Sequence, residues 1–564
     1  QVGGFYGKGG TLAEGALYSN NPAKYREDLA TLAALTPEAV RNALRQWLGR
    51  PAFTLAVVPG ERTERGEQMG GWGDEATTAP AKPAARKAGA AAGKPAATRP
   101  AALKPGPRRA LPDIAPVGEL AFPAVERATL ANGIRVTLAR RTAVPKVLVN
   151  LSFDAGTAAD RLDTPGTQAT MLALLDEGTT TRSATAIAEE QERLGASIAA
   201  ATGLDASAIT LDALSANLAP SLALMADIVR NPRFAPEDVA RVKDQRLAQL
   251  AQAEASPQAR AMRVIAPVLF GGVHPYGLPA DGLGTRPSLA ALTPEALRAA
   301  HGRWLRPDLA RITVVGDVTM AELQPLLEQA FGQWAVPAAP PPAKPLDIAL
   351  PAGQARVLLV DRPNSPQSFI LGGKVLPLSG RDADKEALDL ANEVLGNGFL
   401  SRLNMDLRED KGWSYGVRSQ VTAPVGPRSL LVSAPVQADR TGDALKLLLA
   451  DMRALPATRP VEPGELARVT DGNIRGLPNR FETNAAVLQA VIQNERLGRP
   501  DNYQRSLPER YRRIDAAALN AAARTWLQPE AMTVVIVGDR KLVEPQLKDI
   551  GLPVEVVPTN PAGE

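Results

Sequence analysis

The sequence predicts an α+β fold in which helices pack on a mostly antiparallel sheet, and it predicts that this unit is duplicated. Two observations support this prediction. Amphipathic helical segments alternate with short β-branched runs along most of the 564 residues. In addition, three segments share one pattern: a helix, then Trp-Leu, a break that contains Pro, and a β-branched strand. The tryptophans of the three segments are Trp47, Trp304 and Trp526.

The spacing of these tryptophans predicts the domain organisation. Trp304 and Trp526 lie 222 residues apart, so the repeated unit has the size of a whole domain and is too long for a solenoid repeat. The stretch before Trp47 is too short for such a unit. We therefore expect four parts, which are the tail of a preceding domain of the same type (1–61), a linker (62–118), a first α+β domain (119–342) and a second α+β domain (343–564).

The expected linker carries the basic character of the chain. Residues 81–110 hold eight Lys or Arg and no acidic residue, and without them the formal charge of +4 becomes −4. A tract of Ala, Pro and Lys cannot bury enough apolar surface to fold, so we expect a disordered spacer. The alternative is a basic tail that contacts anionic lipid or nucleic acid, but the spacing of Pro and the absence of aromatic residues favour a solvated spacer, so we expect no nucleic-acid partner. No apolar run approaches the roughly 20 residues of a transmembrane helix, and we expect no transmembrane segment.

Local signals place the first elements of the first domain. Asn132-Gly133 separates two β-branched runs, which is typical of a hairpin. A buried strand should follow over 146–156, then a helix over 164–178 and a second helix after Ser183, which is a suitable N-cap. In the second domain, 366–378 and 428–437 should form strands on either side of a helix near 382–396.

The composition excludes several chemistries. The chain has no Cys, which excludes thiolate sites, and its two histidines, His274 and His301, are too far apart for a helical zinc pair. We expect His274 to be structural, and His301, on a helix beside Trp304, to be packed or solvated and not catalytic. Ser414 lies in Gly-Trp-Ser-Tyr-Gly, which matches the nucleophile elbow of hydrolases, but both histidines precede it and that mechanism needs a later one. The glycosylation sequon at Asn150 falls in an expected buried strand.

Several ordered motifs resemble one family. LANGIRVTL, PGTQATMLALLDEGTTTRSATAIAEEQERLGA, HPYGLPADG and LRPDLARITVVGDV, followed by LGNGFLSRLNMDLREDKGWSYGV, are similar to the pitrilysin/insulinase family of zinc metallopeptidases. The resemblance covers nearly everything outside the linker. It implies a clamshell of two halves, each with two related α+β domains, that closes around a peptide, and it implies zinc in one half.

The zinc motif of the family is lost here. Zinc-binding members carry H-x-x-E-H in the first helix, and the matching positions in this sequence are Ala169, Leu172 and Ala173. The family's third ligand, a Glu in a later helix, falls at about Gln249. The resemblance therefore implies that this chain binds no zinc, that the helix is core, and that zinc belongs to an upstream or partner half. The chain alone should be inactive.

The resemblance implies a role for Arg408 and Tyr415. In the zinc-free half of the family, an Arg and a Tyr at this spacing reach the carbonyl and the oxyanion of the substrate. A guanidinium and a phenol are donors that stabilise negative charge. From the residues alone, an alternative is a salt bridge of Arg408 with Glu409 or Asp410 and a Tyr415 packed under a strand.

Taken together, the sequence leads to two functional expectations. The first is the C-terminal, non-zinc-binding half of a metalloendopeptidase, which encloses and positions a peptide substrate for a zinc site in cis or in trans. The alternative is a non-proteolytic binding or assembly subunit of the same fold. Bacterial relatives favour the periplasm or cell envelope, although the sequence itself does not specify a compartment.

Overall fold

The computed structural model describes residues 4–55, 118–382 and 385–558. It divides into two compact units, 1–116 and 117–564. The expected linker lies outside the described residues except for Gly118. In the described part of the chain no helix is long and apolar enough to cross a membrane.

The first unit is helical. It contains α1 (Gly4–Ser19), α2 (Lys24–Ala33) and α3 (Pro37–Leu48). The hydroxyl of Thr36 accepts a hydrogen bond from the Ala39 amide and caps α3, as its Thr-Pro start predicts. No side chain of α2 or α3 is buried, and Trp47 is exposed. Helices of this size are marginal without packing, which is consistent with the tail of a larger domain, although that assignment stays a prediction.

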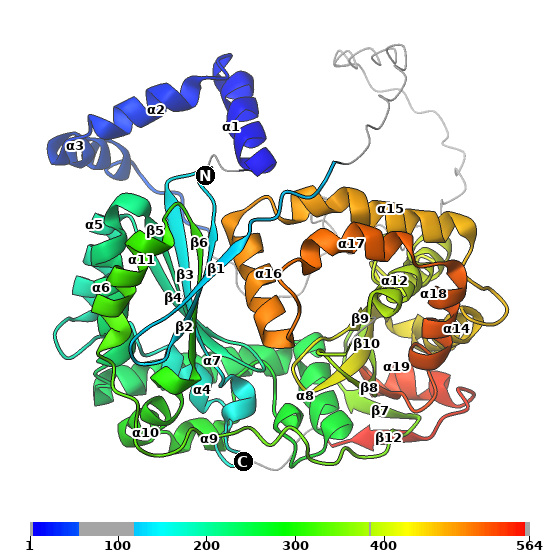
Figure 1. Cartoon of the computed structure of the whole chain (residues 1–564). Helices are drawn as coiled ribbons and strands as arrows, with labels where there is room; N and C mark the ends of the chain where they lie inside the picture. The colour runs from blue at the N-terminus through cyan, green and yellow to red at the C-terminus, as the bar shows by residue number, and fades with distance from the viewer. Residues whose placement is uncertain (1–3, 56–117, 383–384, 559–564) are drawn as a thin grey trace, which may run out of the picture. The chain divides into compact units, whose positions relative to one another are not determined.

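The second unit contains two six-stranded sheets with equivalent strand orders (Figure 1). The first sheet has the order β1-β2-β6-β3-β5-β4 and the second β12-β7-β11-β8-β10-β9. In both sheets one central pair is parallel, β2 with β6 and β7 with β11, and the strands from there to the β4 or β9 edge are antiparallel. The sheets differ at the other edge, where β1 pairs antiparallel with β2 and β12 pairs parallel with β7. The duplicated, mostly antiparallel α+β architecture is therefore confirmed. The strands are β1 (Val125–Thr129), β2 (Arg135–Arg140), β3 (Lys146–Phe153), β4 (Ser197–Thr202), β5 (Ser207–Leu214), β6 (Ala310–Gly316), β7 (Arg356–Asp361), β8 (Gln367–Ser379), β9 (Arg418–Val421), β10 (Pro427–Gln437), β11 (Thr533–Gly538) and β12 (Val554–Val557).

Helices follow the strands in both halves of this unit. Those that lie between β3 and β7 along the chain are α4 (Thr167–Leu172), α5 (Ala184–Leu194), α6 (Leu218–Arg230), α7 (Pro236–Ala255), α8 (Pro257–Phe270), α9 (Arg286–Ala291), α10 (Pro294–Trp304) and α11 (Met320–Leu327). Those that follow β8 are α12 (Lys385–Leu395), α13 (Arg402–Asn404), α14 (Thr441–Ala454), α15 (Pro463–Arg480), α16 (Asn484–Leu497), α17 (Tyr503–Arg512), α18 (Ala516–Trp526) and α19 (Arg540–Val543).

Two local predictions meet different outcomes. Asn132-Gly133 forms the predicted turn of the β1–β2 hairpin, and Gly133 has a φ of +90°, which glycine adopts without strain. The helix expected over 164–178 is shorter than predicted, because α4 ends at Leu172. Beyond it, the amides of Leu174 and Leu175 bond to carbonyls three residues earlier, so the chain tightens into turns.

Each half of the second unit contributes one helix that packs on the sheet of the other half, and these two helices join the halves. Helix α8 packs on β8 and β11 of the second sheet, and α16 packs on β6, β3 and β2 of the first (Figure 1). Gly373 on β8 permits the first contact, because a Cβ there would lie 2.6 Å from Cδ1 of Ile265 on α8. Helices of the same half therefore cover one face of each sheet, and a helix of the other half covers the opposite face.

Candidate functional site

Arg408 and Tyr415 lie close together on one segment between α12 and β9. The chain passes through α13 and one π-helical turn, η6 (Met405–Asp410), and then reverses at Gly412. The φ of Gly412 is +64°, a conformation that favours glycine. After this turn the ring centroid of Tyr415 lies 6.0 Å from the guanidinium carbon of Arg408. The structure therefore brings the two sequence-predicted residues together.

The guanidinium of Arg408 contacts a second aromatic ring. Its Cζ lies 4.6 Å from the ring centroid of Phe399, within the range of a cation–π interaction. Its Nη1 also lies 2.8 Å from Oε1 of Glu409, in a contact without hydrogen-bond geometry. The ion pair that the alternative interpretation expects is therefore present, yet Nη1 still has no hydrogen-bond acceptor among the described residues.

The aromatic side chains around Arg408 face solvent. Tyr415 is 70% exposed and Phe399 is 66% exposed, and Leu400 and Met405 on the same segment are exposed as well. The alternative in which Tyr415 packs under a strand is therefore wrong. We call Phe399, Leu400, Met405, Arg408 and Tyr415 the Arg408 surface. It offers apolar contact together with two hydrogen-bond donors, which suits a peptide chain and negative charge on its carbonyl oxygens.

Buried polar side chains hold the Arg408 surface in place. Nδ2 of Asn404 donates to the carbonyl of Phe399 at 2.7 Å, and its Oδ1 accepts from the amide of Val417 at 3.2 Å. Asn404 is buried, so it ties the Phe399 and Tyr415 segments together. Ser414 donates to the carbonyl of Pro435 at 2.6 Å. That hydroxyl is buried and already engaged, which agrees with the exclusion of Ser414 as a nucleophile.

A carboxylate pair supports the π-helical turn that carries Arg408. Nη1 of Arg459 donates to Asp406 on η6 at 2.9 Å and to Asp451 on α14 at 3.1 Å. Burial and the nearby carboxylate of Asp406 raise the pKa of Asp451 above its usual range. Oδ2 of Asp451 is buried and has no hydrogen-bond partner among the described residues. The pair therefore costs stability when both carboxylates are charged.

This carboxylate pair predicts a pH-dependent effect of Asp451→Asn. A carboxyl group with a raised pKa in the folded state destabilises the fold progressively as pH rises from about 4 toward that raised pKa. Asn keeps the acceptor for Arg459 and does not ionise. The difference in melting temperature, variant minus wild type, should therefore increase by about 2–4 °C between pH 5 and pH 8. Asp439→Asn, at an exposed carboxylate in the 3-10 turn that precedes α14, is the control. A difference that stays constant or shrinks with pH would contradict this assignment.

The positions that match the family's zinc ligands carry no metal-binding group. Ala169 and Leu172 on α4 are buried in the core, Ala173 is partly buried, and Gln249 is exposed on α7. Ala169 also packs directly against the backbone of Gly282, where a Cβ would lie 3.0 Å from that of Ala169. The helix is therefore core, as expected, and has no room for an imidazole at this position.

A cation lies beside the same helix. Nη2 of Arg246, on α7, donates to the carbonyl of Ala169 at 2.6 Å. Burial lowers the pKa of Arg246, but a guanidinium remains protonated in proteins. A fixed positive charge beside Ala169 opposes a divalent cation there. Among the described residues no three His, Asp or Glu side chains come together as metal ligands. The residues at these positions do not fit zinc.

Both histidines have structural roles. His274 is fully buried, its Nδ1 accepts from the Tyr276 amide at 3.0 Å, and its Nε2 faces the carbonyl of Leu346 at 3.2 Å. Nε2 of His301 lies 2.8 Å from the carbonyl of Val229. Burial lowers the pKa of both imidazoles, so they remain neutral. Asn150 is also buried, on β3, where its amide donates to Thr210.

Sequence reasoning missed three residues of these sites. Phe399 contacts Arg408, Asn404 joins the two segments, and Arg246 lies next to Ala169. For Phe399 a signal existed, because an aromatic residue precedes Arg408 by nine positions in a Gly-rich stretch. Arg246 lies 77 residues from Ala169, so no local pattern could have indicated it.

Two family models match this chain. Residues 135–270 match the model described as insulinase (peptidase family M16), and residues 291–472 match the one described as peptidase M16 inactive domain. Among curated relatives, an uncharacterized zinc protease of Mycobacterium tuberculosis is 28% identical over 424 residues, covering 74% of this chain and 94% of the relative. The uncharacterized zinc protease YmxG of Bacillus subtilis is 25% identical over 295 residues, covering 52% and 69%.

Two solved structures are also similar to this chain. A peptidase M16 inactive domain from Pseudomonas fluorescens is 26% identical with a TM-score of 0.67, covering 74% of this chain and 98% of that one. A protease from Helicobacter pylori has a TM-score of 0.68 over 74% and 100% of the two chains, and at 18% identity it supports the fold alone.

Proposed function

Because the chain belongs to the insulinase (peptidase M16) family, we propose that it is the non-zinc-binding half of a metalloendopeptidase. In this proposal it encloses a peptide and positions it for hydrolysis by a zinc site elsewhere, in cis or in trans. The observation that carries the proposal is a contrast between two sets of residues. The positions that match the zinc ligands hold Ala169, Leu172, Ala173 and Gln249, none of which binds zinc, and Arg246 lies beside Ala169. Arg408 and Tyr415, by contrast, lie together on an exposed surface.

The proposed chemistry of the Arg408 surface is electrostatic. The guanidinium of Arg408 and the phenol of Tyr415 donate hydrogen bonds to the peptide carbonyl and to the negative charge that develops on its oxygen. Such donors act most strongly when their position is fixed before the reaction. Here Asn404 and the two aromatic contacts supply that fixed position. Phe399 and Leu400 add apolar contact for side chains of the peptide.

The proposal is tested by separating metal binding from hydrolysis. The purified chain, equilibrated with trace zinc and dialysed, should contain no stoichiometric zinc by elemental mass spectrometry and should hydrolyse no peptide. Addition of a zinc-bearing half, as a separate polypeptide or in one chain, should produce hydrolysis. Stoichiometric zinc with hydrolysis by this chain alone would contradict the proposal. If the added half gives no hydrolysis that depends on this chain, the chain is a binding or assembly subunit instead.

A further inference from the structure

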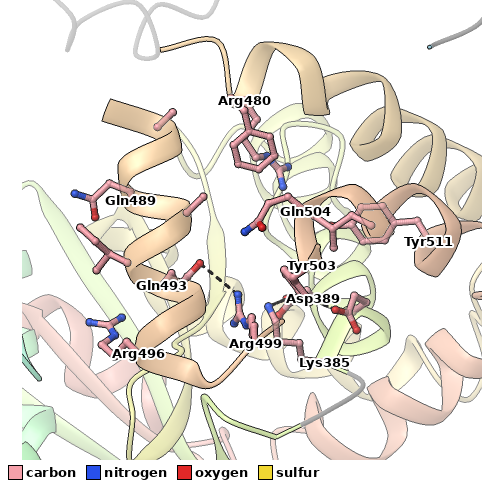
Figure 2. A pocket seen from close by; sticks show the side chains of 16 residues that line it. Lys385, Asp389, Arg480, Gln489, Gln493, Arg496, Arg499, Tyr503, Gln504 and Tyr511 are labelled. Atoms are coloured by element: carbon pink, nitrogen blue, oxygen red, sulfur yellow. Dashed lines mark hydrogen bonds and ion pairs between the residues drawn. The ribbon is translucent and has the colours of Figure 1, made fainter. Parts of the chain in front are cut away.

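A polar cavity lies between helices α12, α16 and α17, away from the Arg408 surface (Figure 2). Its volume is about 410 Å³, which is in the range of small-molecule sites. Figure 2 shows Arg480 and Arg499 on opposite sides of this cavity, with Gln493 of α16 beside Arg499 and hydrogen-bonded to it. We call it the Arg499 pocket. No residue of the Arg408 surface lines it.

The cations of the Arg499 pocket outnumber its available carboxylates. Asp389 is paired with Lys385 at 3.1 Å and with Arg428 at 3.3 Å. The other carboxylate, Glu386, accepts from the Tyr503 hydroxyl at 2.6 Å and lies 3.6 Å from Arg510. Within the described part of the chain, neither Arg480 nor Arg499 is in salt-bridge contact with a carboxylate.

Arg499 has carboxylates nearby, Asp389 and Glu386, but among the described residues none is in salt-bridge contact with it. Its Nη1 makes one long hydrogen bond, 3.4 Å, to Gln493, and its Nη2 is buried without a partner among the described residues. Its guanidinium contacts the ring of Tyr503, with Cζ at 4.7 Å from the centroid. Burial lowers the pKa of Arg499, because removing the cation from water is unfavourable. An anion in the pocket would offset this cost.

The unpartnered atoms indicate the kind of ligand. Among the described residues that line the pocket, the buried side-chain atoms without a hydrogen-bond partner are Nη2 of Arg499 and Nε of Arg496. Figure 2 shows Arg496 on the side of α16 away from Arg499, so Nη2 of Arg499 is the atom that bears on the ligand. Both atoms are donors, and no carboxylate or amide oxygen of the lining shares this state. The missing group is therefore an acceptor. Guanidinium groups bind the oxygens of carboxylates and phosphates in preference to other acceptors.

We propose that the Arg499 pocket binds a small oxyanion with several negative charges, held by Arg480 and Arg499 from opposite sides. Carboxylates and phosphates share this chemistry, and both classes include molecules small enough for the cavity. The proposal does not depend on the role of the Arg408 surface in hydrolysis, because the two sites share no residue.

The test uses the full chain and two probes, tripolyphosphate and citrate, in isothermal titration calorimetry at low ionic strength. We expect one of the probes, or both, to bind with a stoichiometry near one, and Arg499→Gln to weaken this binding at least tenfold. Arg480→Gln should weaken it in the same way, and it serves as the second variant if Arg499→Gln does not fold. Arg440→Gln removes the same charge from an exposed position on η7 (Ala438–Arg440) and should bind as the wild type does.

The outcomes show which class of anion the pocket binds and whether the proposal is correct. Binding of tripolyphosphate alone assigns the pocket to phosphates, binding of citrate alone assigns it to carboxylates, and binding of both assigns it to oxyanions in general. The probe should also raise the melting temperature of the wild type and of Arg440→Gln, but not that of the two pocket variants. If neither probe binds, or if both folded pocket variants bind as the wild type does, the proposal is wrong.

Discussion

Replacing Arg408 by Ala, or Tyr415 by Phe, in the complete zinc-containing protein should lower the turnover number for peptide hydrolysis by roughly ten- to a thousand-fold. In the proposed function, each change removes one donor to the developing negative charge while the peptide can still occupy the site. The effect should therefore appear mainly in kcat, measured with a fluorogenic peptide over a range of concentrations. Tyr415→Phe is the sharper variant, since it removes a single hydroxyl from a ring that is already exposed.

Two controls separate this role from a structural one. Arg475→Ala removes an exposed arginine from α15 and should leave kcat unchanged. The melting temperature of Tyr415→Phe should lie close to that of the wild type, because the side chain is mostly exposed and the ring is kept. Peptide hydrolysis at the wild-type rate in both Arg408→Ala and Tyr415→Phe would remove the Arg408 surface from the mechanism.

Rebuilding the family's zinc motif in this chain should fail and should destabilise it. The triple variant Ala169→His, Leu172→Glu and Ala173→His places a carboxylate at a core position and an imidazole against Gly282, beside the charge of Arg246. An unpaired buried charge costs several kcal/mol, so we expect the free energy of unfolding to fall by more than about 3 kcal/mol. Denaturant titration with and without zinc measures this change.

An uncharged substitution at Leu172 serves as the control for the introduced charge. Leu172→Met keeps the volume of the side chain and should cost less than about 1.5 kcal/mol. Adding zinc should not restore the stability of the triple variant, because Arg246 still lies beside Ala169 and Gln249 is not a good third ligand. Tight stoichiometric zinc binding, accompanied by a rise in stability, would show that the site needs only its ligands and that the packing around α4 is no obstacle.

Much of the fold could be predicted because its signals are local. Asn132-Gly133 specifies a tight turn through its own backbone preferences, and the repeated pattern around Trp304 and Trp526 indicates a duplicated unit whatever its packing. The sequence pattern predicts too long an α4. Its apolar periodicity continues through Leu175, whereas the helix ends at Leu172 and the chain then tightens into turns. A hydrophobic pattern reports burial and does not fix where a helix ends.

The residues of the candidate sites also fall into two groups: those that the sequence indicates and those that only the tertiary structure reveals. By itself the sequence determined that Ala169, Leu172 and Ala173 cannot coordinate zinc, because that depends only on which functional groups are present, and it placed Arg408 and Tyr415 seven residues apart. Only the tertiary structure decided that Arg246 lies beside α4 and that Arg480 and Arg499 face one cavity. These contacts join side chains from separate helices, and their geometry is set by how those helices pack.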